Sequence, residues 1–212
     1  IRPKRVIRPG ERPLHALRER GVEYVEVRLM DLDPFEPVAI NATTCRMLDV
    51  FLVHCLLRDS PPDTPEELAA VIGNKQRVAA RGREPGLRLV RGGDEVPLIE
   101  WGERILGECE PIAAALDAAK GTQAHRDALA LAGARLANPA DTPSARVLQA
   151  IEREYGNSYV RFVLAQSRRH RDTISALPPA GGPAERFAQL AEESGREQRE
   201  IEAADTIPFE VF

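Results

Sequence analysis

The segment Gly21–Asp31, which reads GVEYVEVRLMD, decides how the first part of the chain is built. Between positions 22 and 30, apolar and polar residues alternate with the period of two that is typical of a β-strand. One face of this predicted strand carries Val25, Val27 and Leu29, and the other carries Tyr24, Glu26 and Arg28. The alternation therefore predicts a strand over 22–30 with one apolar face and one polar face.

The polar face of the predicted strand places an acid and a base two residues apart. The Glu26 carboxylate is an oxygen ligand of the kind that Mg²⁺ prefers, and the Arg28 guanidinium is a planar fork that matches phosphate oxygens. Glu26 is therefore a candidate metal ligand, and Arg28 is a candidate contact to a transferred phosphoryl group. Spacing alone leaves open the alternative of an ordinary surface ion pair, which is common and weak.

A short basic cluster opens the chain as IRPKR. Arg2, Lys4 and Arg5 are candidate contacts to nucleotide phosphates, because clustered positive charge beside the strand could neutralise them. A solvated basic run remains the alternative. A second basic cluster, RRHR at 168–171, falls at the end of a predicted helix, where positive charge complements the helix dipole.

Downstream of the strand the pattern is mainly helical. Capping residues and prolines mark helix starts, glycines mark ends, and turn residues at 92–94 predict a small hairpin near 87–98. We expect helices over 13–20, 41–57, 64–81, 100–119, 122–136, 143–154, 158–174 and 183–203. The expected fold class is α+β and predominantly helical, with residues 1–40 forming the terminal portion of a sheet and residues 41–212 a mainly helical body.

The predicted strand needs a partner, because an isolated strand or two-stranded hairpin is marginal in water. The first residue is Ile1, the first methionine is Met30, and the opening thirteen residues are dense in charge and proline. We therefore expect the chain to be cut from a longer protein whose upstream part supplies the neighbouring strands.

The charge balance argues against two classes of partner. With 29 basic and 33 acidic residues, the net charge of −4 gives no general attraction to nucleic acid or to an anionic membrane. The longest nearly apolar run, 50–57, is far shorter than the roughly 20 residues that span a bilayer. Cys45, Cys55 and Cys109 show no CxxC spacing, which favours free thiols in a reducing cytoplasm.

Three segments together carry a resemblance to a known family: IRPKR, GVEYVEVRLMDLDPFEP and the closing EAADTIPFEVF. They resemble the C-terminal portion of the proteobacterial type of glutamate–cysteine ligase, the first enzyme of glutathione synthesis. The resemblance implies a glutamine-synthetase-like catalytic fold, of which this chain would be the downstream part. It also implies ATP as a substrate, Mg²⁺ as a cofactor, and a γ-glutamyl phosphate intermediate that reacts with the amine of cysteine.

By the same resemblance, Glu26 matches a Mg²⁺ ligand and Arg28 matches the arginine that contacts the transferred phosphoryl group. Most other metal-binding carboxylates, a metal-binding histidine and much of the cysteine pocket lie in the earlier part of the family's sequence. The expected partners are therefore L-glutamate, L-cysteine, ATP and the missing N-terminal part, and the chain alone is expected to be inactive. The competing hypothesis is a non-catalytic interaction or assembly module whose helices bind a partner.

Overall fold

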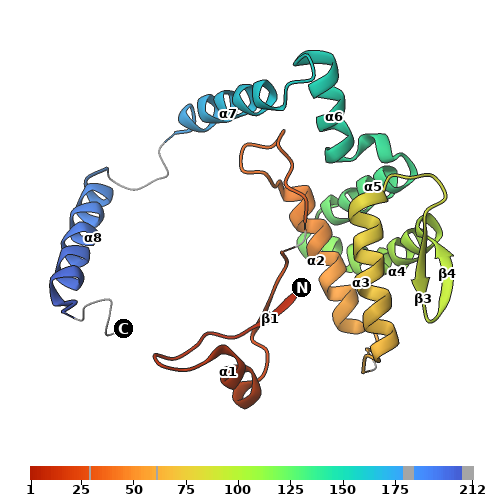
Figure 1. The fold of residues 1–212 in the computed structure, drawn as a ribbon, viewed down its shortest axis with the longest axis horizontal. Coiled ribbons are helices and arrows are strands. Elements are labelled where there is room, and N and C mark those ends of the chain that lie inside the picture. Colours follow the sequence, from red (N-terminus) through yellow and green to blue (C-terminus); the bar gives the residue numbers. More distant parts are fainter. Residues whose placement is uncertain (29, 61, 179–183, 207–212) are drawn as a thin grey trace. The chain divides into compact units, whose positions relative to one another are not determined.

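The structure, a computed structural model, describes residues 1–28, 30–60, 62–178 and 184–206. Most of this described chain is helical, with two small two-stranded sheets (Figure 1). The helices are α1 (Pro13–Arg20), α2 (Ala42–Leu57), α3 (Pro65–Arg81), α4 (Leu98–Lys120), α5 (Ala124–Ala137), α6 (Pro143–Glu154), α7 (Tyr159–Ser175) and α8 (Ala184–Ala204), with a 3₁₀ turn η1 (Pro139–Asp141). The strands are β1 (Arg2–Lys4), β2 (Tyr24–Glu26), β3 (Arg88–Arg91) and β4 (Asp94–Pro97). The predicted class, α+β and predominantly helical, is confirmed.

The chain divides into two compact units, Ile1–Arg171 and Asp172–Phe212. The second unit contains the end of α7 and the amphipathic helix α8, which exposes Phe187, Leu190 and Ile201. The division of the sequence at residue 40 into a sheet portion and a helical body stays a prediction. Leu29 of the predicted strand, Pro183 of the last predicted helix and residues 207–212 of the closing segment lie outside the described residues.

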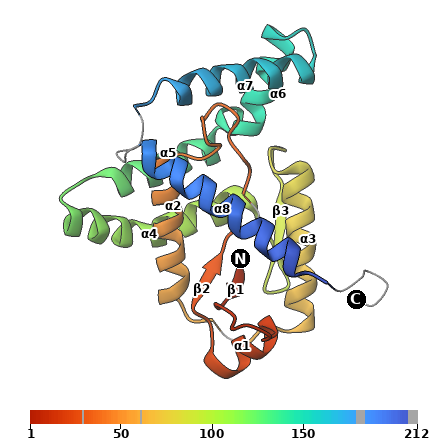
Figure 2. The same ribbon diagram turned by 90° about the vertical axis from the view of Figure 1, so that its left-hand side faces the viewer.

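Strands β1 and β2 form an antiparallel ribbon, with α1 beside it (Figure 2). The register pairs Arg2 with Glu26, Pro3 with Val25 and Lys4 with Tyr24. We expected the neighbouring strands to come from a part of the longer protein that precedes Ile1. For one neighbour this expectation is wrong, because residues 2–4 of this chain form the strand that pairs with β2.

The ribbon is shorter and more open than the alternation predicted. Strand β2 covers three residues in place of 22–30, because only the three residues of β1 face it across the ladder. Val25, on the face expected to be buried, is 46% exposed. A two-stranded ribbon with an uncovered apolar face gains little from burial, so it depends on its connections to the rest of the molecule.

Helix α1 connects the two strands and packs against β1. Pro13 occupies its first turn, Ala16 is fully buried, and Gly21 ends the helix with a positive φ of 71°. Arg20 donates hydrogen bonds to both carboxylate oxygens of Glu11, at 2.6 and 2.8 Å. This bidentate pair ties the last turn of the helix to the segment that precedes it.

The Glu11–Arg20 pair predicts a pH-dependent contribution to stability. Hydrogen bonding from Arg20, followed by the Arg8 N–H, lowers the pKa of Glu11 from 4.5 to about 2. Because the folded pKa lies below the unfolded value, this stabilisation is present above about pH 4.5 and is lost as the pH falls toward 2. We expect Glu11→Gln to lower the Tm by about 1–2 °C at neutral pH, as for an ion pair near the surface.

Thermal unfolding followed by circular dichroism checks this expectation. The Tm difference between the wild-type chain and Glu11→Gln should shrink steadily as the pH is lowered through the acid range. Glu19→Gln, on the exposed side of the same helix, is the control and should show no such trend. A difference for Glu11→Gln that stays constant with pH would show that the pair does not titrate as described.

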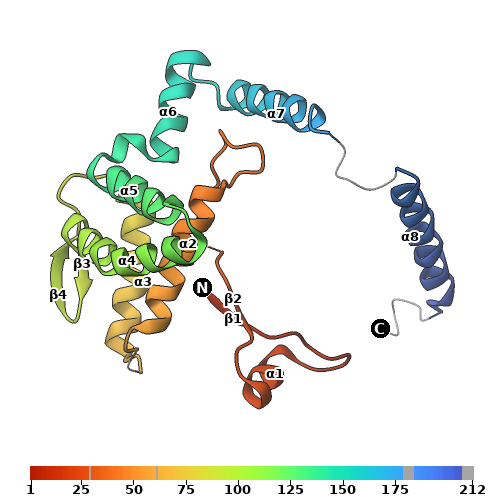
Figure 3. The same ribbon diagram turned by 180° about the vertical axis from the view of Figure 1, so that it is seen from behind.

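The core of the first unit lies between α2, α4 and α5 (Figures 1 and 3). Its buried residues are Val50, Cys109, Ala113 and Leu129, and the partly buried residues packed on them are Met47, Ile105, Leu106, Ile112 and Leu116. Gly102 marks a close approach of α4 to α5, because a Cβ there would lie 2.6 Å from Cδ2 of Leu136. Helix α2 leaves Leu56 and Leu57 exposed at its end.

The turn between α4 and α5 is closed by the carboxylate of Asp117, which is 1% exposed. Its Oδ1 accepts hydrogen bonds from the backbone N–H of His125 and the hydroxyl of Thr122, both at 2.9 Å. The same oxygen lies 2.8 Å from Nδ1 of His125, and Oδ2 accepts from the backbone N–H of Arg126 at 3.0 Å. The side chain of Gln123, which precedes α5, makes no capping bond, so Asp117 of the previous helix caps α5.

The second sheet is the predicted hairpin, β3 and β4, joined by a two-glycine turn. Gly92 and Gly93 have φ values of 59° and 91°, the region that a tight hairpin turn requires and that glycine adopts without strain. Asn74 of α3 donates a hydrogen bond to the carbonyl oxygen of Val90 and accepts one from its N–H. This amide pairing fixes α3 to the hairpin.

Candidate functional site

The ribbon brings three charged side chains into contact. Oε2 of Glu26 lies 2.9 Å from Nε of Arg28 and 3.3 Å from Nζ of Lys4, on the facing strand. The side chains of Glu26, Arg28 and Lys4 are 35%, 48% and 35% exposed, respectively, so the cluster is accessible at the surface. We call Lys4, Glu26 and Arg28 the ribbon triad. The two residues predicted to act together are therefore neighbours, and Lys4 joins them.

The triad keeps the Glu26 carboxylate charged. The Arg28 guanidinium lowers the pKa of Glu26; burial opposes this shift, and the Lys4 ammonium adds to it, so the pKa lies below its ordinary value. The contacts of Glu26 with Arg28 and Lys4 are ion pairs. Oε2 of Glu26, which is buried, accepts no hydrogen bond of good geometry. Glu26 is consequently ionised at neutral pH, which is the state that a metal ligand requires.

The other predicted phosphate contacts have different surroundings. Nε of Arg5 donates a hydrogen bond to the carbonyl oxygen of Gly21 at 2.6 Å, and its Nη1 lies 3.6 Å from Oε2 of Glu23. Arg5, which follows β1, is thus tied to the residues between α1 and β2. Arg2 is exposed and lies opposite Glu26 in the ladder, next to the triad. A phosphate-binding role for Arg2, Lys4 and Arg5 stays a prediction.

The prediction that Glu26 is a metal ligand would give a divalent cation one carboxylate position on this ribbon. Over residues 1–28, 30–60, 62–178 and 184–206, no group of three or more His, Cys, Asp or Glu side chains gathers where it could hold a metal. Mg²⁺ takes about six oxygen ligands in near-octahedral geometry and usually keeps several waters. The residues present fit one position of such a site and do not complete it.

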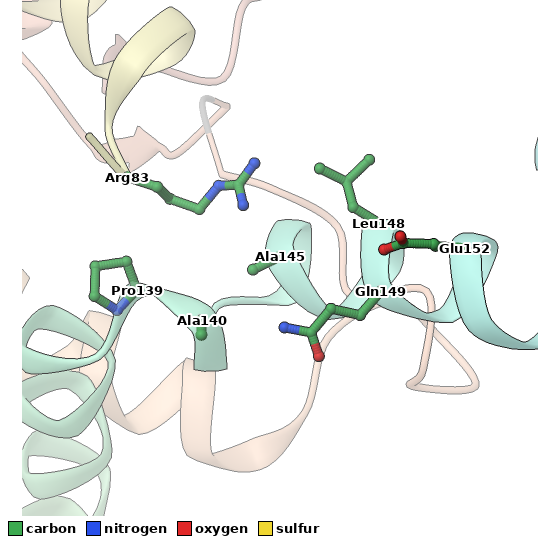
Figure 4. Close-up of a pocket in the computed structure, with 7 residues that line it drawn as sticks. All are labelled: Arg83, Pro139, Ala140, Ala145, Leu148, Gln149 and Glu152. Atoms are coloured by element: carbon green, nitrogen blue, oxygen red, sulfur yellow. The ribbon is translucent and has the colours of Figure 1, made fainter. Parts of the chain in front are cut away.

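Two surface pockets lie away from the triad. One, of about 270 Å³, is lined by Arg83, Pro139, Ala140, Ala145, Leu148, Gln149 and Glu152. Figure 4 shows Arg83 extending from the segment after α3 toward Leu148 of α6. The other, of about 320 Å³, is lined by Arg77, Arg81, Glu84, Gly86, Leu87, Arg88 and Glu95. No residue predicted from the sequence to act on metal or phosphate lines either pocket.

Residues 31–41, which we call the post-strand loop, connect the ribbon to α2. Two consecutive residues of this loop, Pro34 and Phe35, contact α6 and α7. The ring of Phe35 meets that of Phe162 edge-on with centroids 5.8 Å apart, and the Arg146 guanidinium lies 4.3 Å from the Phe35 centroid. Nε2 of His170 lies 2.7 Å from the carbonyl oxygen of Pro34. These contacts join residues more than 100 positions apart, so no local sequence pattern predicts them.

Comparison with known proteins relates the segment that holds the ribbon triad to a ligase family. The profile of the family described as glutamate–cysteine ligase matches residues 1–78, a segment that contains both strands of the ribbon and the post-strand loop. Curated relatives extend the similarity to the whole chain. The glutamate–cysteine ligases of Azotobacter vinelandii and Saccharophagus degradans are 43% and 39% identical to it, over 100% of this chain and 40% of theirs.

A solved structure agrees with the curated relatives. The crystal structure of glutamate–cysteine ligase from Francisella tularensis in complex with AMP matches with a TM-score of 0.81 and 31% identity, over 98% of this chain and 40% of that chain. The chain is therefore similar to glutamate–cysteine ligases along its whole length, and it spans about 40% of the length of the curated relatives that it matches. The resemblance seen in the sequence is confirmed.

Among the residues that the structure describes, no helix is both long enough and apolar enough to cross a membrane.

Proposed function

We propose that this chain is the C-terminal portion of an ATP- and Mg²⁺-dependent glutamate–cysteine ligase, which carries out the first step of glutathione biosynthesis. The observation that carries the proposal is the contact between Glu26 and Arg28 on an open ribbon, within the segment that matches the family. The relatives are named for this activity, and the solved relative holds AMP, which supports a nucleotide substrate.

The proposed reaction has two steps. In the first, an oxygen of the γ-carboxylate of L-glutamate attacks the γ-phosphorus of ATP, which forms γ-glutamyl phosphate and releases ADP. In the second, the amine of L-cysteine attacks the acyl carbon, phosphate leaves and the nitrogen loses a proton, so that the amide bond is complete. Mg²⁺, when bound, neutralises charge on the phosphates, as in other phosphoryl transfers.

Within this reaction we assign different roles to the acid and the base of the triad. Glu26 would supply one carboxylate oxygen to Mg²⁺, and its depressed pKa keeps that oxygen charged at neutral pH. Arg28 would contact the transferred phosphoryl group, where its planar fork matches two oxygens. Lys4 holds the Glu26 carboxylate from the facing strand, and Arg2 and Arg5 would add positive charge near the nucleotide phosphates. Catalysis of this kind consists mainly of positioning and charge neutralisation.

The open geometry of the ribbon supports an incomplete site. Tyr24 and Val25 are 51% and 46% exposed on opposite faces of β2, so neither face of the strand is covered. A ribbon of this size is marginal in water unless further strands or helices pack on it. We propose that the part of the ligase absent from this chain supplies those strands, the remaining metal ligands and most of the cysteine pocket. We also propose that the complete ligase works in the cytoplasm.

The alternative, a non-catalytic interaction or assembly module, has no observation in its favour. The relatives are named as glutamate–cysteine ligases, and this chain aligns with 40% of their length.

A steady-state assay on the full-length protein that contains this chain tests the proposal. ADP release should require glutamate, cysteine and Mg²⁺ together, and the product should have the mass of γ-glutamylcysteine. Glu26→Gln should raise the Mg²⁺ concentration for half-maximal rate by about tenfold or more, because an amide is a poorer ligand than a carboxylate. Glu19→Gln, an exposed glutamate of α1 outside the triad, is the matched control. ADP release that does not depend on the two amino acids would overturn the proposal.

A further inference from the structure

The post-strand loop is an ordered element with its own hydrogen bonds. The N–H of Asp33 donates to the carbonyl oxygen of Ala39 at 3.0 Å, which closes the loop across its base. Oδ1 of Asp33 accepts from the N–H of Phe35, and Oε1 of Glu36 accepts from Nδ2 of Asn41. Asn41 in turn caps α2 through its Oδ1. The loop therefore holds one shape between the ribbon and the helical body.

Side chains of helices α6 and α7 contact the post-strand loop. In addition to its position over the Phe35 ring, Arg146 of α6 places Nη1 3.8 Å from Oδ2 of Asp33. Phe162 of α7, which packs edge-on against Phe35, is 1% exposed and also meets the ring of Tyr155 at 5.6 Å. The His170 ring donates through Nε2 to the carbonyl oxygen of Pro34, since a carbonyl can only accept. The loop lies beside α6 and α7 in Figures 1 and 3.

We propose that Phe35, Arg146 and His170 are positioning residues that fix Glu26 and Arg28 relative to the helical body, and we call them the loop clamp. The inference rests on the proposed ligase function. The open ribbon has little burial to hold it, and the clamped loop begins a few residues after Arg28. A displacement of about 1 Å in a group that contacts the transferred phosphoryl can cost about 10²-fold in rate. A clamp that fixes the loop would reduce such displacement.

Substitution of His170 tests the clamp with a matched rescue. His170→Leu removes the donor to Pro34, whereas His170→Gln keeps an N–H that can reach the same carbonyl oxygen. In the full-length ligase we expect His170→Leu to lower kcat about tenfold and to change the KM values by less than about twofold, because Arg28 acts mainly in the transition state. His170→Gln should stay within about twofold of the wild type. Arg168→Leu, an exposed change on the same helix, is the control.

A double-mutant cycle separates positioning from a general loss of stability. If His170 acts through Arg28, the His170→Leu change should have little further effect on kcat in an Arg28→Ala background. A merely structural effect would lower kcat by the same factor in both backgrounds, and that result would overturn the proposal. Thermal melts of each variant give the folded fraction to which the rates are normalised.

Hydrogen exchange of the 212-residue chain gives a readout that needs no activity. We expect the amides of 24–36 to exchange about fivefold faster in His170→Leu than in the wild type, with no change in Arg168→Leu. Unchanged exchange in 24–36 would contradict the clamp, whatever the enzyme does. If the full-length wild-type protein lacks ligase activity while exchange responds as expected, the proposed function fails and the clamp on the ribbon stands as a structural element.

Discussion

Replacement of Arg28 by alanine is expected to lower kcat/KM for ligation by about 10²–10³-fold, the range seen when a preorganised transition-state contact is removed. Arg28 is 48% exposed and contacts Glu26 through Nε, which directs one edge of its guanidinium to the carboxylate and leaves its terminal nitrogens for phosphate oxygens. Because the side chain is exposed, its removal should change the Tm by no more than about 2 °C. The loss would therefore come from chemistry rather than from unfolding.

Two variants sharpen the Arg28 prediction. Arg28→Lys keeps the charge and loses the planar fork, so it should recover less than about a tenth of the wild-type rate. Arg18→Ala, an exposed arginine of α1, should leave the rate unchanged. Initial rates of ADP release in the full-length protein, at saturating glutamate and cysteine, provide the measurement. Wild-type rates for Arg28→Ala would remove Arg28 from the proposed site.

Replacement of Asp117 by alanine is expected to cause the largest loss of stability. The carboxylate is almost fully buried and accepts bonds from two backbone N–H groups, a hydroxyl and the His125 ring. Burial alone raises its pKa, and the bonds from His125, Arg126 and Thr122 more than offset this, so the pKa lies well below its ordinary value. The alanine variant leaves the buried donors of His125 and the partly buried donors of Thr122 and Arg126 without this acceptor, and His125 already has an unpartnered Nε2 among the described residues.

We expect Asp117→Ala to lower the Tm by roughly 10 °C, since two buried and two partly buried donors lose their acceptor at once. Asp117→Asn keeps the shape and one acceptor oxygen, so its Tm should fall between those of the wild type and the alanine variant. Asp127→Ala, in the exposed first turn of α5, is the control and should change the Tm by less than about 2 °C. If the alanine variant does not fold, urea unfolding of the Asp117→Asn variant gives the comparison. Equal stability of the Asp117→Asn variant and the wild type would contradict the capping role.

The sign of the pH dependence at Asp117 follows from its lowered pKa. A carboxylate with a folded pKa below its unfolded value stabilises the fold above the unfolded pKa, and this contribution is lost as the pH falls through the folded pKa. The turn between α4 and α5 should therefore keep its carboxylate charged at acidic pH values where exposed aspartates are already protonated.

The helices could be predicted from the sequence because their signals are local. Asn41 and Thr64 cap α2 and α3 through their side chains, Pro65 and Pro143 occupy first turns, and Gly121 ends α4 in the left-handed region. Each of these signals depends on residues within one turn of the helix end. The boundaries consequently agree with the observed helices to within about two residues, which is the usual uncertainty of a helix end.

Strand β1 could not be predicted, because three residues that include a proline carry no usable alternation. Its pairing with β2 depends on α1, which returns the chain to its starting point. For the same reason the sequence predicted that Glu26 and Arg28 would share a face but did not predict that Lys4 would contact Glu26. Asp117 and the loop clamp were missed because their partners lie on other elements, and a single sequence shows no such pairing.

Reconstitution of the ligase tests the central claim most directly. The 212-residue chain is joined to the part of the Azotobacter vinelandii relative that it does not cover, and γ-glutamylcysteine is measured by mass after incubation with glutamate, cysteine, ATP and Mg²⁺. The chain alone should give no product, the joined protein should give product, and Arg28→Ala in the joined protein should abolish most of it. A joined protein that folds but forms no γ-glutamylcysteine, or one that forms it equally well with Arg28→Ala, would contradict the proposal that the ribbon triad is part of the catalytic site.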